Sequence, residues 1–199
     1  MISKSHIKNT RRQRILKKGG QSSTFSKFSM SDSLARVEAE VRSCTKCRLY
    51  KTAQCSVPGE GSARSRIMLV GQAPGAQEDK SGRPFVGRAG QFLDRILQKV
   101  GLSREDIFIT SVVKHYPPKN RVPRADEISA CLPYLERQLR LVAPRTVVLL
   151  GNVAVRALRH HPLMKNKNVI STVHPSAAMR FPRMKRKFEA DLARLKRFL

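Results

Sequence analysis

Cysteines are the clearest candidates for metal binding in this sequence. Cys44 and Cys47 are separated by two residues, a spacing with which thiolates hold zinc or an iron–sulfur cluster. Two thiolates do not complete such a site, and Cys131 is the candidate for a third ligand. From residue types alone, a zinc ion held by three cysteines and one histidine is one interpretation. Cys55, eight residues past Cys47, is interpreted as an ordinary loop cysteine.

A second candidate region is a segment rich in glycine, proline and polar residues. It reads Gly-Gln-Ala-Pro-Gly at 71–75 and Gly-Arg-Pro-Phe-Val-Gly at 82–87. Glycines let a ligand approach the backbone closely, and Pro74 stiffens the turn. Gln72 offers an amide and Glu78 offers a carboxylate. Without further context, the same segment is typical of a tight loop whose acids are solvated.

His174 is the third candidate, because it follows an apolar run and precedes Pro175. A proline disfavours the helical conformation of the residue before it, which predicts an exposed loop around His174. An imidazole in such a loop serves either as a structural hydrogen-bonding group or as a proton donor in a site.

These side chains need a scaffold, and the hydrophobic pattern predicts an α/β domain. Short β-branched or aliphatic runs predict buried strands at 67–70, 107–113, 146–150 and 169–173. Helical periodicity is found at 90–100, 126–141, 153–158 and 183–199, and in the apolar face formed by Leu34, Val37 and Val41. This alternation favours right-handed crossovers and a mostly parallel sheet. Ligands bind beyond the carboxyl ends of such strands, which selects the loops 71–87, 114–124, 151–152 and 174–180.

The charge of the chain restricts its partners. Its 199 residues include 40 Lys and Arg but 14 Asp and Glu, a formal net charge of +26. Such a charge calls for a polyanionic partner and favours nucleic acid over a small neutral ligand. The apolar runs are too short for a membrane span, and the first thirty residues hold no apolar signal region. We therefore expect no membrane partner, a reducing compartment (cytoplasmic or associated with the nucleoid) and no disulfides.

Residues 1–30 predict a disordered basic arm ahead of a single domain at 31–199. They contain eight Lys or Arg and no Asp or Glu, a composition that cannot bury enough apolar surface to order itself. An organellar transit peptide and a plain solvated tail are alternative interpretations. A further alternative is that translation starts at Met30, since Ser31 and Asp32 are suited to cap the first helix.

The glycine-rich segment, taken together with Val173-His174-Pro175-Ser176, resembles the uracil-DNA glycosylase superfamily. The resemblance covers residues 43–180 and is greatest to the iron–sulfur group called family 4. The motifs that carry it, in family order, are Cys-Thr-Lys-Cys at 44–47, Gly-Gln-Ala-Pro-Gly at 71–75, the run 82–90 and Pro-Pro-Lys-Asn-Arg at 117–121. It implies a three-layer α/β/α sandwich around a central four-stranded, mostly parallel sheet. It also implies a monomeric, monofunctional glycosylase that hydrolyses uracil from DNA containing that deaminated base.

The resemblance further implies roles for individual residues. His174 would donate a hydrogen bond to uracil O2 as the base leaves as an anion, and so would stabilise charge that develops in the transition state. Glu78 would orient water or hold the loop, and Phe85 would stack on the flipped base. The implied catalytic residues are Gln72, Glu78 and His174, and the implied base-binding residues are Gln72, Ala73, Pro74, Phe85, Ser111 and His174. The implied DNA-binding loop, with Met179 as a minor-groove wedge, comprises Pro175, Ser176, Ala177, Ala178, Met179 and Arg180.

Two departures from the family pattern bear on the substrate. Gln72 stands where family 4 usually has glutamate; another group of uracil glycosylases has glutamine there, followed by a catalytic aspartate, but here Ala73 follows. Ser111 stands where asparagine is usual, and a hydroxyl cannot span uracil N3 and O4 as an amide does. A glycosylase for hypoxanthine or xanthine and a non-catalytic DNA-binding homologue are therefore alternatives.

The resemblance also implies a [4Fe-4S] cluster with three cysteine ligands, Cys44, Cys47 and Cys131. The family has its remaining cysteine at position 115, where this chain has His115. Histidine replaces cysteine in Rieske centres, so His115 is the expected fourth ligand, with Cys55, a zinc ion or a lost cluster as alternatives. A relative that cross-links itself to uracil-DNA also carries Lys-His here, but the stretch 116–124 lacks the basic insert of that relative. Covalent capture is therefore not implied.

The basic arm generates the first testable prediction, because cations without acidic partners act on phosphate rather than on bases. Each neutralised phosphate contributes about −0.9 to the slope of log K against log salt, so an arm using half of its charges contributes roughly −3 to −4. Deleting residues 1–29 should weaken DNA binding alike for all sequences and flatten the salt dependence, with little change in the saturated reaction rate. Comparison of the full chain with a chain starting at Met30 tests this. Coinciding salt slopes would remove the arm from DNA binding.

Overall fold

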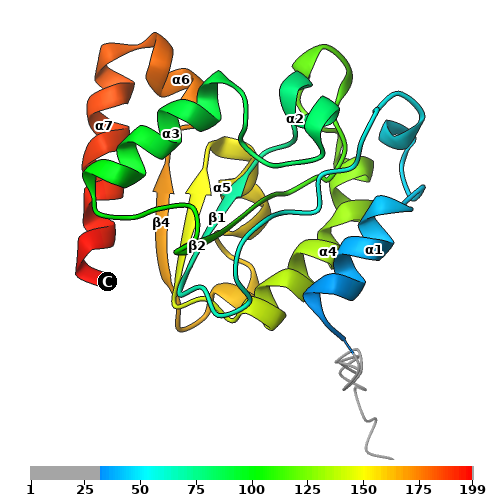
Figure 1. Cartoon of the computed structure of the whole chain (residues 1–199), viewed down its shortest axis with the longest axis horizontal. Helices are drawn as coiled ribbons and strands as arrows, with labels where there is room; N and C mark the ends of the chain where they lie inside the picture. The colour runs from blue at the N-terminus through cyan, green and yellow to red at the C-terminus, as the bar shows by residue number, and fades with distance from the viewer. Residues whose placement is uncertain (1–31, 199) are drawn as a thin grey trace, which may run out of the picture. The chain divides into compact units, whose positions relative to one another are not determined.

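The computed structural model describes residues 32–198, and the predicted basic arm lies outside them. The centre of the domain is a sheet of parallel strands in the order β2-β1-β3-β4 (Figure 1). The strands are β1 (Ile67–Gly71), β2 (Ile107–Ser111), β3 (Thr146–Leu150) and β4 (Asn168–Thr172). The predicted α/β fold with a four-stranded parallel sheet is confirmed. Because all strands run in one direction, their carboxyl ends meet at one edge, where ligands of such sheets bind.

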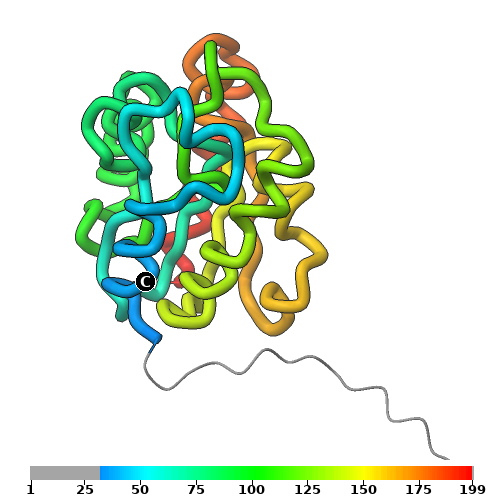
Figure 2. Tube along the Cα trace, turned by 90° about the vertical axis from the view of Figure 1, so that its right-hand side faces the viewer, coloured from blue at the N-terminus to red at the C-terminus, as the bar shows by residue number. Residues whose placement is uncertain are grey.

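Helices cover both faces of the sheet. The described α-helices are α1 (Leu34–Arg42), α2 (Ala76–Ser81), α3 (Arg88–Lys99), α4 (Ala125–Val142), α5 (Asn152–Leu158), α6 (Pro175–Arg180) and α7 (Pro182–Ala193). Short 3-10 helices lie at η1 (Arg48–Lys51), η2 (Pro118–Asn120), η3 (Pro162–Met164) and η4 (Arg194–Phe198). Helices α1, α4 and α5 pack on one face of the sheet, and α3, α6 and α7 pack on the other. Figure 2 views the domain from the side of α1 and α4.

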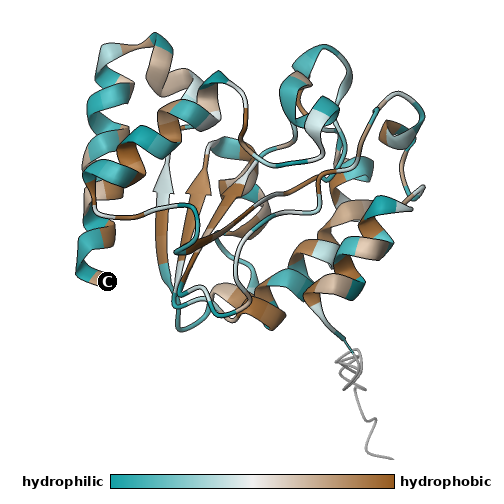
Figure 3. Cartoon of the chain, in the orientation of Figure 1, coloured by the Kyte–Doolittle hydropathy of each residue, from teal (hydrophilic) through white to brown (hydrophobic). Residues whose placement is uncertain are grey.

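Alternate residues of each strand join different halves of the core, as the period of two in an extended chain requires. In β1, Met68 and Val70 pack with α1 and α4, whereas Ile67 and Leu69 pack with α3 and α7. Every residue of β1, β2 and β3 is buried, which is why these strands form continuous apolar runs in the sequence. Figure 3 shows the hydrophobic residues gathered on the sheet and on the helix sides that face it.

The predicted strand at 107–113 is too long, because β2 ends at Ser111. Val112 and Val113 are apolar and buried, yet they turn over the end of β1. Their N–H groups donate to the carbonyls of Gly71 and Gln72 at 2.9 and 3.3 Å. Burial at this turn, rather than strand structure, explains the apolar pattern of these two residues.

The segment 174–180, predicted as an exposed loop, contains the helix α6. His174 is half-buried and has the extended conformation expected before a proline. It acts as the N-cap, since its Nδ1 accepts a hydrogen bond from the Ser176 N–H. Pro175 then occupies the first helical position, where its missing N–H costs nothing.

Among the described helices, none combines the length and apolar content that a membrane span requires.

Candidate active site

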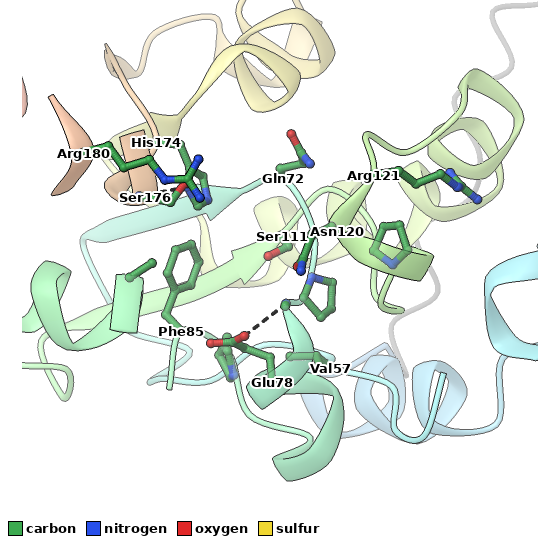
Figure 4. Close-up of a pocket in the computed structure, with 16 residues that line it drawn as sticks. Val57, Gln72, Glu78, Phe85, Ser111, Asn120, Arg121, His174, Ser176 and Arg180 are labelled. Carbon is green, nitrogen blue, oxygen red and sulfur yellow. Dashed lines mark hydrogen bonds between the residues drawn. The ribbon is translucent and has the colours of Figure 1, made fainter. Parts of the chain in front are cut away.

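A cavity of 490 Å³ lies at the carboxyl edge of the sheet (Figure 4). The loop after β1 supplies one wall, the end of β2 supplies the floor, and the start of α6 supplies the opposite wall. Nine of the predicted site residues line this cavity: Gln72, Ala73, Pro74, Glu78, Phe85, Ser111, His174, Ser176 and Arg180. The cavity is also lined by residues that were not predicted individually as site residues: Val57, Ala89, Pro117, Asn120 and Arg121. The last four lie in the motifs at 82–90 and 117–121.

Phe85 reaches the cavity only because two glycines make room for it. Its backbone has a φ of 52°, which is uncommon for a residue other than glycine. A Cβ on Gly90 would lie 1.7 Å from the Phe85 carbonyl oxygen, and a Cβ on Gly71 would lie 2.5 Å from the Phe85 ring. The ring stacks on His174, with centroids 6.1 Å apart and planes 28° apart. Any larger residue at either glycine would displace this aromatic wall.

His174 is held as a neutral imidazole. Burial lowers its pKa to about 4, although the Glu78 carboxylate opposes the shift. Its Nδ1 accepts from the Ser176 N–H at 3.3 Å and lies 2.8 Å from the Ser176 hydroxyl oxygen. A neutral imidazole that accepts through Nδ1 carries its proton on Nε2. The ring can therefore donate one hydrogen bond at the cavity without carrying a charge.

Glu78 closes the loop that forms the cavity wall. Its Oε2 accepts from the Gly75 N–H at 3.1 Å, and its Oε1 accepts from the Gly87 N–H at 2.8 Å. The carboxylate thereby joins the two ends of the segment that carries Phe85, with α2 between them. The structure thus favours the loop-holding role, while the remaining lone pairs still allow contact with water.

The edge of the cavity opposite α6 is anchored by an ion pair. Arg121 makes two hydrogen bonds to the fully buried carboxylate of Glu127, at 2.8 and 2.6 Å. These bonds hold the pKa of Glu127 below its usual value against the opposing effect of burial. Asn120, with a left-handed φ of 56°, is thereby fixed against the cavity. Its amide is a recognition group of the kind that Ser111 lacks, and the motif at 117–121 was the signal that could have identified it.

The predicted DNA-binding loop divides into buried and accessible residues. Pro175 and Ala178 are buried, Ala177 and Met179 are half-buried, and Ser176 and Arg180 are exposed. Met179 packs against the core that includes α3 and α7. Phe181, directly after α6, is 54% exposed. The most accessible apolar side chain at this end of α6 is therefore Phe181 rather than the predicted wedge.

The three predicted cysteine ligands gather where η1 approaches α4. Cys44 and Cys47 are half-buried against the core that contains Cys131. Burial raises the pKa of the Cys131 thiol to about 11, and the charge of Lys114 with a backbone hydrogen bond from that residue opposes the rise. Burial also raises the pKa of Cys47, against a backbone hydrogen bond from Leu49. These interactions favour thiolates once a metal group offsets the burial.

By residue type, this group of side chains suits either a zinc ion or an iron–sulfur cluster. Within residues 32–198, no three His, Cys, Asp or Glu side chains converge as ligands of one metal ion. A zinc ion draws its ligands to about 2.0–2.3 Å, whereas a cluster places its own iron and sulfide between them. His115 is buried, which lowers its pKa and favours the neutral form that binds metals. Cys55 lies apart, with its Sγ 4.0 Å from the Lys80 carbonyl oxygen beside α2.

Comparison with known proteins finds relatives over most of the chain. The model of the uracil DNA glycosylase superfamily matches residues 58–196. A type-4 uracil-DNA glycosylase of Pyrobaculum aerophilum is 41% identical over 179 residues, 80% of this chain and 91% of that protein. The type-4 enzyme of Sulfurisphaera tokodaii is 40% identical over 185 residues, 83% of this chain and 84% of that protein. The type-4 enzyme of Thermotoga maritima is 40% identical over 157 residues, 72% and 82% of the two chains.

The neutral state of His174 is directly testable by NMR. Its ring signals should titrate near pH 4 rather than near 6.5, because burial disfavours the imidazolium. The unfolded chain then binds this proton more readily, so the domain should lose stability as the pH falls from about 6.5 to about 4. Glu78→Gln should lower the pKa further, since the carboxylate raises it. A titration midpoint near 6.5 would contradict the proposed neutral donor.

Proposed function

The chain belongs to the uracil DNA glycosylase superfamily, and we propose that this cavity receives uracil flipped out of DNA and hydrolyses its N-glycosidic bond. Excision of uracil is the first step of base excision repair. The observation that carries the proposal is the neutral His174, stacked on Phe85 and able to donate through Nε2 at the cavity. The enzyme is proposed to act as a monomer on DNA that contains the deaminated base.

Base flipping is required because the reacting carbon is shielded inside the duplex. The flipped uracil stacks on Phe85, and its polar edge faces the floor formed by Ser111. The cavity walls offer the amides of Gln72 and Asn120 to the same base. Ala73 and Pro74 supply backbone and apolar contacts from the loop after β1. The exposed Ser176 and Arg180 would contact DNA beside the cavity, with Met179 or the more exposed Phe181 as the apolar residue next to the stack.

Bond cleavage places negative charge on the uracil and positive charge on the sugar. A donor that stays neutral is suited to O2, because its hydrogen bond strengthens as the base becomes an anion. Gln72 can position water but cannot remove a proton from it at neutral pH. Glu78 is close enough to the cavity to polarise water, although its main contacts hold the loop. An oxocarbenium-like sugar needs no strong nucleophile, so water positioned by these groups suffices.

Cys44, Cys47, His115 and Cys131 are proposed to hold a [4Fe-4S] cluster. The cluster would supply a covalent cross-link between the segment before η1 and α4, and Lys114 and Leu49 support its ligands with backbone hydrogen bonds. Since the first turn of α4 contains the Glu127 that anchors Arg121, the cross-link would fix one edge of the cavity. The role is therefore structural, and the reaction proceeds on protein groups.

A second candidate function rests on Ser111. Its hydroxyl lies at the floor of the cavity, where an amide would read uracil. An enzyme that removes hypoxanthine or xanthine would tolerate this change, and a binding protein without activity would also tolerate it. Release assays with duplexes carrying each deaminated base separate these alternatives.

The roles of Ser111 and His174 give a prediction on activity. Ser111→Asn should increase the single-turnover rate on uracil relative to hypoxanthine and xanthine, because an amide pairs both polar groups of the uracil edge. His174→Ala should lower the rate by about 10²–10³-fold through loss of a transition-state donor, with a much smaller loss of DNA affinity. Unchanged turnover in His174→Ala would remove this residue from the reaction. Release of no base by the parent protein would support the binding-only alternative.

The cluster gives a separate prediction on composition. Anaerobically purified protein should contain iron and inorganic sulfide, and alanine at Cys44, Cys47 or Cys131 should abolish both, because each position supplies a ligand. Cys55→Ala is the matched control and should retain them, as should His115→Cys, which keeps a ligand at that position. Colourless protein with stoichiometric zinc would contradict the cluster. Loss of iron in Cys55→Ala but not in His115→Ala would identify Cys55, rather than His115, as the fourth ligand.

A further inference from the structure

Lys114 is among the largest fully buried side chains of the described domain. It lies directly after the turn that ends β2, and its side chain extends back beneath the cavity floor. Its Nζ donates to the Thr110 hydroxyl oxygen at 2.6 Å, to the Ser111 carbonyl oxygen at 2.8 Å and to the Gln138 side-chain oxygen at 2.8 Å. Burial of a lysine at such a position requires that its polar atoms find partners.

The hydrogen bonds identify this group as an ammonium ion. Gln138 turns its amide nitrogen toward the Pro58 carbonyl at 2.7 Å, so its oxygen faces Lys114. The Thr110 hydroxyl donates to the same carbonyl at 2.9 Å, so it accepts from Lys114. Nζ therefore meets three acceptors, and only the ammonium form supplies three N–H donors.

The charge of Lys114 has no carboxylate beside it. All three acceptors of Nζ are neutral oxygens, and the ionisable group on which its charge acts is Cys131. One of these oxygens belongs to Ser111, which lines the cavity. The field of the buried charge thus reaches the base site through a region of low dielectric, where it is weakly screened.

The cavity needs such a charge if a base leaves it as an anion. His174 is neutral, and Glu78 contributes a negative charge to the same cavity. Arg121 is already paired with Glu127, and Arg180 is exposed to water, which screens it. We propose that Lys114 is a positioning residue that acts through Ser111, and that its ammonium stabilises the negative charge developing on the departing base. This inference rests on the proposed glycosylase function and adds a residue to its mechanism.

Two substrates distinguish this electrostatic role from a structural one. Single-turnover rates are measured on the same duplex with uracil or with 5-fluorouracil, whose anion is more stable because fluorine withdraws electrons. Lys114→Met and Lys114→Gln should slow uracil release by about 10- to 100-fold, the scale of one charge in a partly screened interior. The loss on 5-fluorouracil should be smaller. The rate on 5-fluorouracil divided by the rate on uracil should therefore rise several-fold in both variants.

A third variant tests the charge without removing Lys114. Gln138→Glu places a carboxylate beside Nζ, in a side chain of the same shape, and should raise the same ratio by neutralising the ammonium. Lys167→Met is the matched control. That lysine is half-buried and also donates to a backbone carbonyl, that of Pro144, at 2.8 Å, but it precedes β4 at the opposite end of the strands. Both of its rates should equal those of the parent protein.

The rates on the two substrates distinguish an electrostatic role of Lys114 from a structural role and from no role. Equal losses on the two substrates would assign Lys114 a structural role only, and unchanged rates would remove it from the mechanism. Loss of iron with an unchanged rate ratio would show that the charge serves the cysteines instead. If the parent protein releases neither base, the proposed function itself fails, whatever the variants do.

Discussion

The site depends on the hydrogen bonds that carry the chain from β2 over the end of β1. Gly71 and Ser111 are paired in the sheet, and the next two N–H groups donate to the carbonyls of Gly71 and Gln72. This fixes the cavity floor relative to the loop that carries Phe85. Three residues past Ser111, the Lys114 carbonyl accepts from the N–H of Val57, which lines the cavity. The five-residue segment 111–115 therefore links Ser111, the proposed base reader, to the loop that carries Phe85 and to Cys131.

Charge is distributed so that binding and chemistry use different groups. The formal charge of +26 includes many exposed cations on α6 and α7, among them Arg180 and Arg183, and these can hold phosphates without entering the cavity. Inside the cavity, the donor is an imidazole kept neutral by burial. The buried ammonium of Lys114 lies behind the floor, where in the proposed mechanism it acts on the base without forming an ion pair with DNA. The exposed cations can therefore bind phosphates tightly without stabilising the unreacted base. The negative charge that develops on the departing base is stabilised by groups that are already in position, the Lys114 ammonium and the His174 donor.

The sequence predicts the fold and most of the cavity because these follow from local patterns. Buried parallel strands appear as apolar runs, and the loops at their carboxyl ends must share one edge, so Gln72, Ser111 and His174 could be grouped without coordinates. The errors come from contacts between distant residues. Val112 and Val113 are buried in a turn, and the apolar run alone does not distinguish that from a strand. The burial of Lys114, the fit of Phe85 against Gly90 and the position of Val57 depend on packing partners that periodicity does not specify.

Two of the three departures from the family pattern lie at the ends of this same segment, with Ser111 at one end and His115 at the other. A histidine ligand is neutral whereas a cysteine ligand is an anion, so the proposed ligand set carries one negative charge fewer than a set of four thiolates. Lys114 lies between these residues and interacts with the Cys131 thiol. Less of its positive field is then offset by the cluster, and more of it acts at the cavity floor. Stronger stabilisation of the leaving anion would offset in part the amide contact that Ser111 cannot make. In the proposed mechanism, the histidine and the serine are linked through the charge of Lys114, which lies between them.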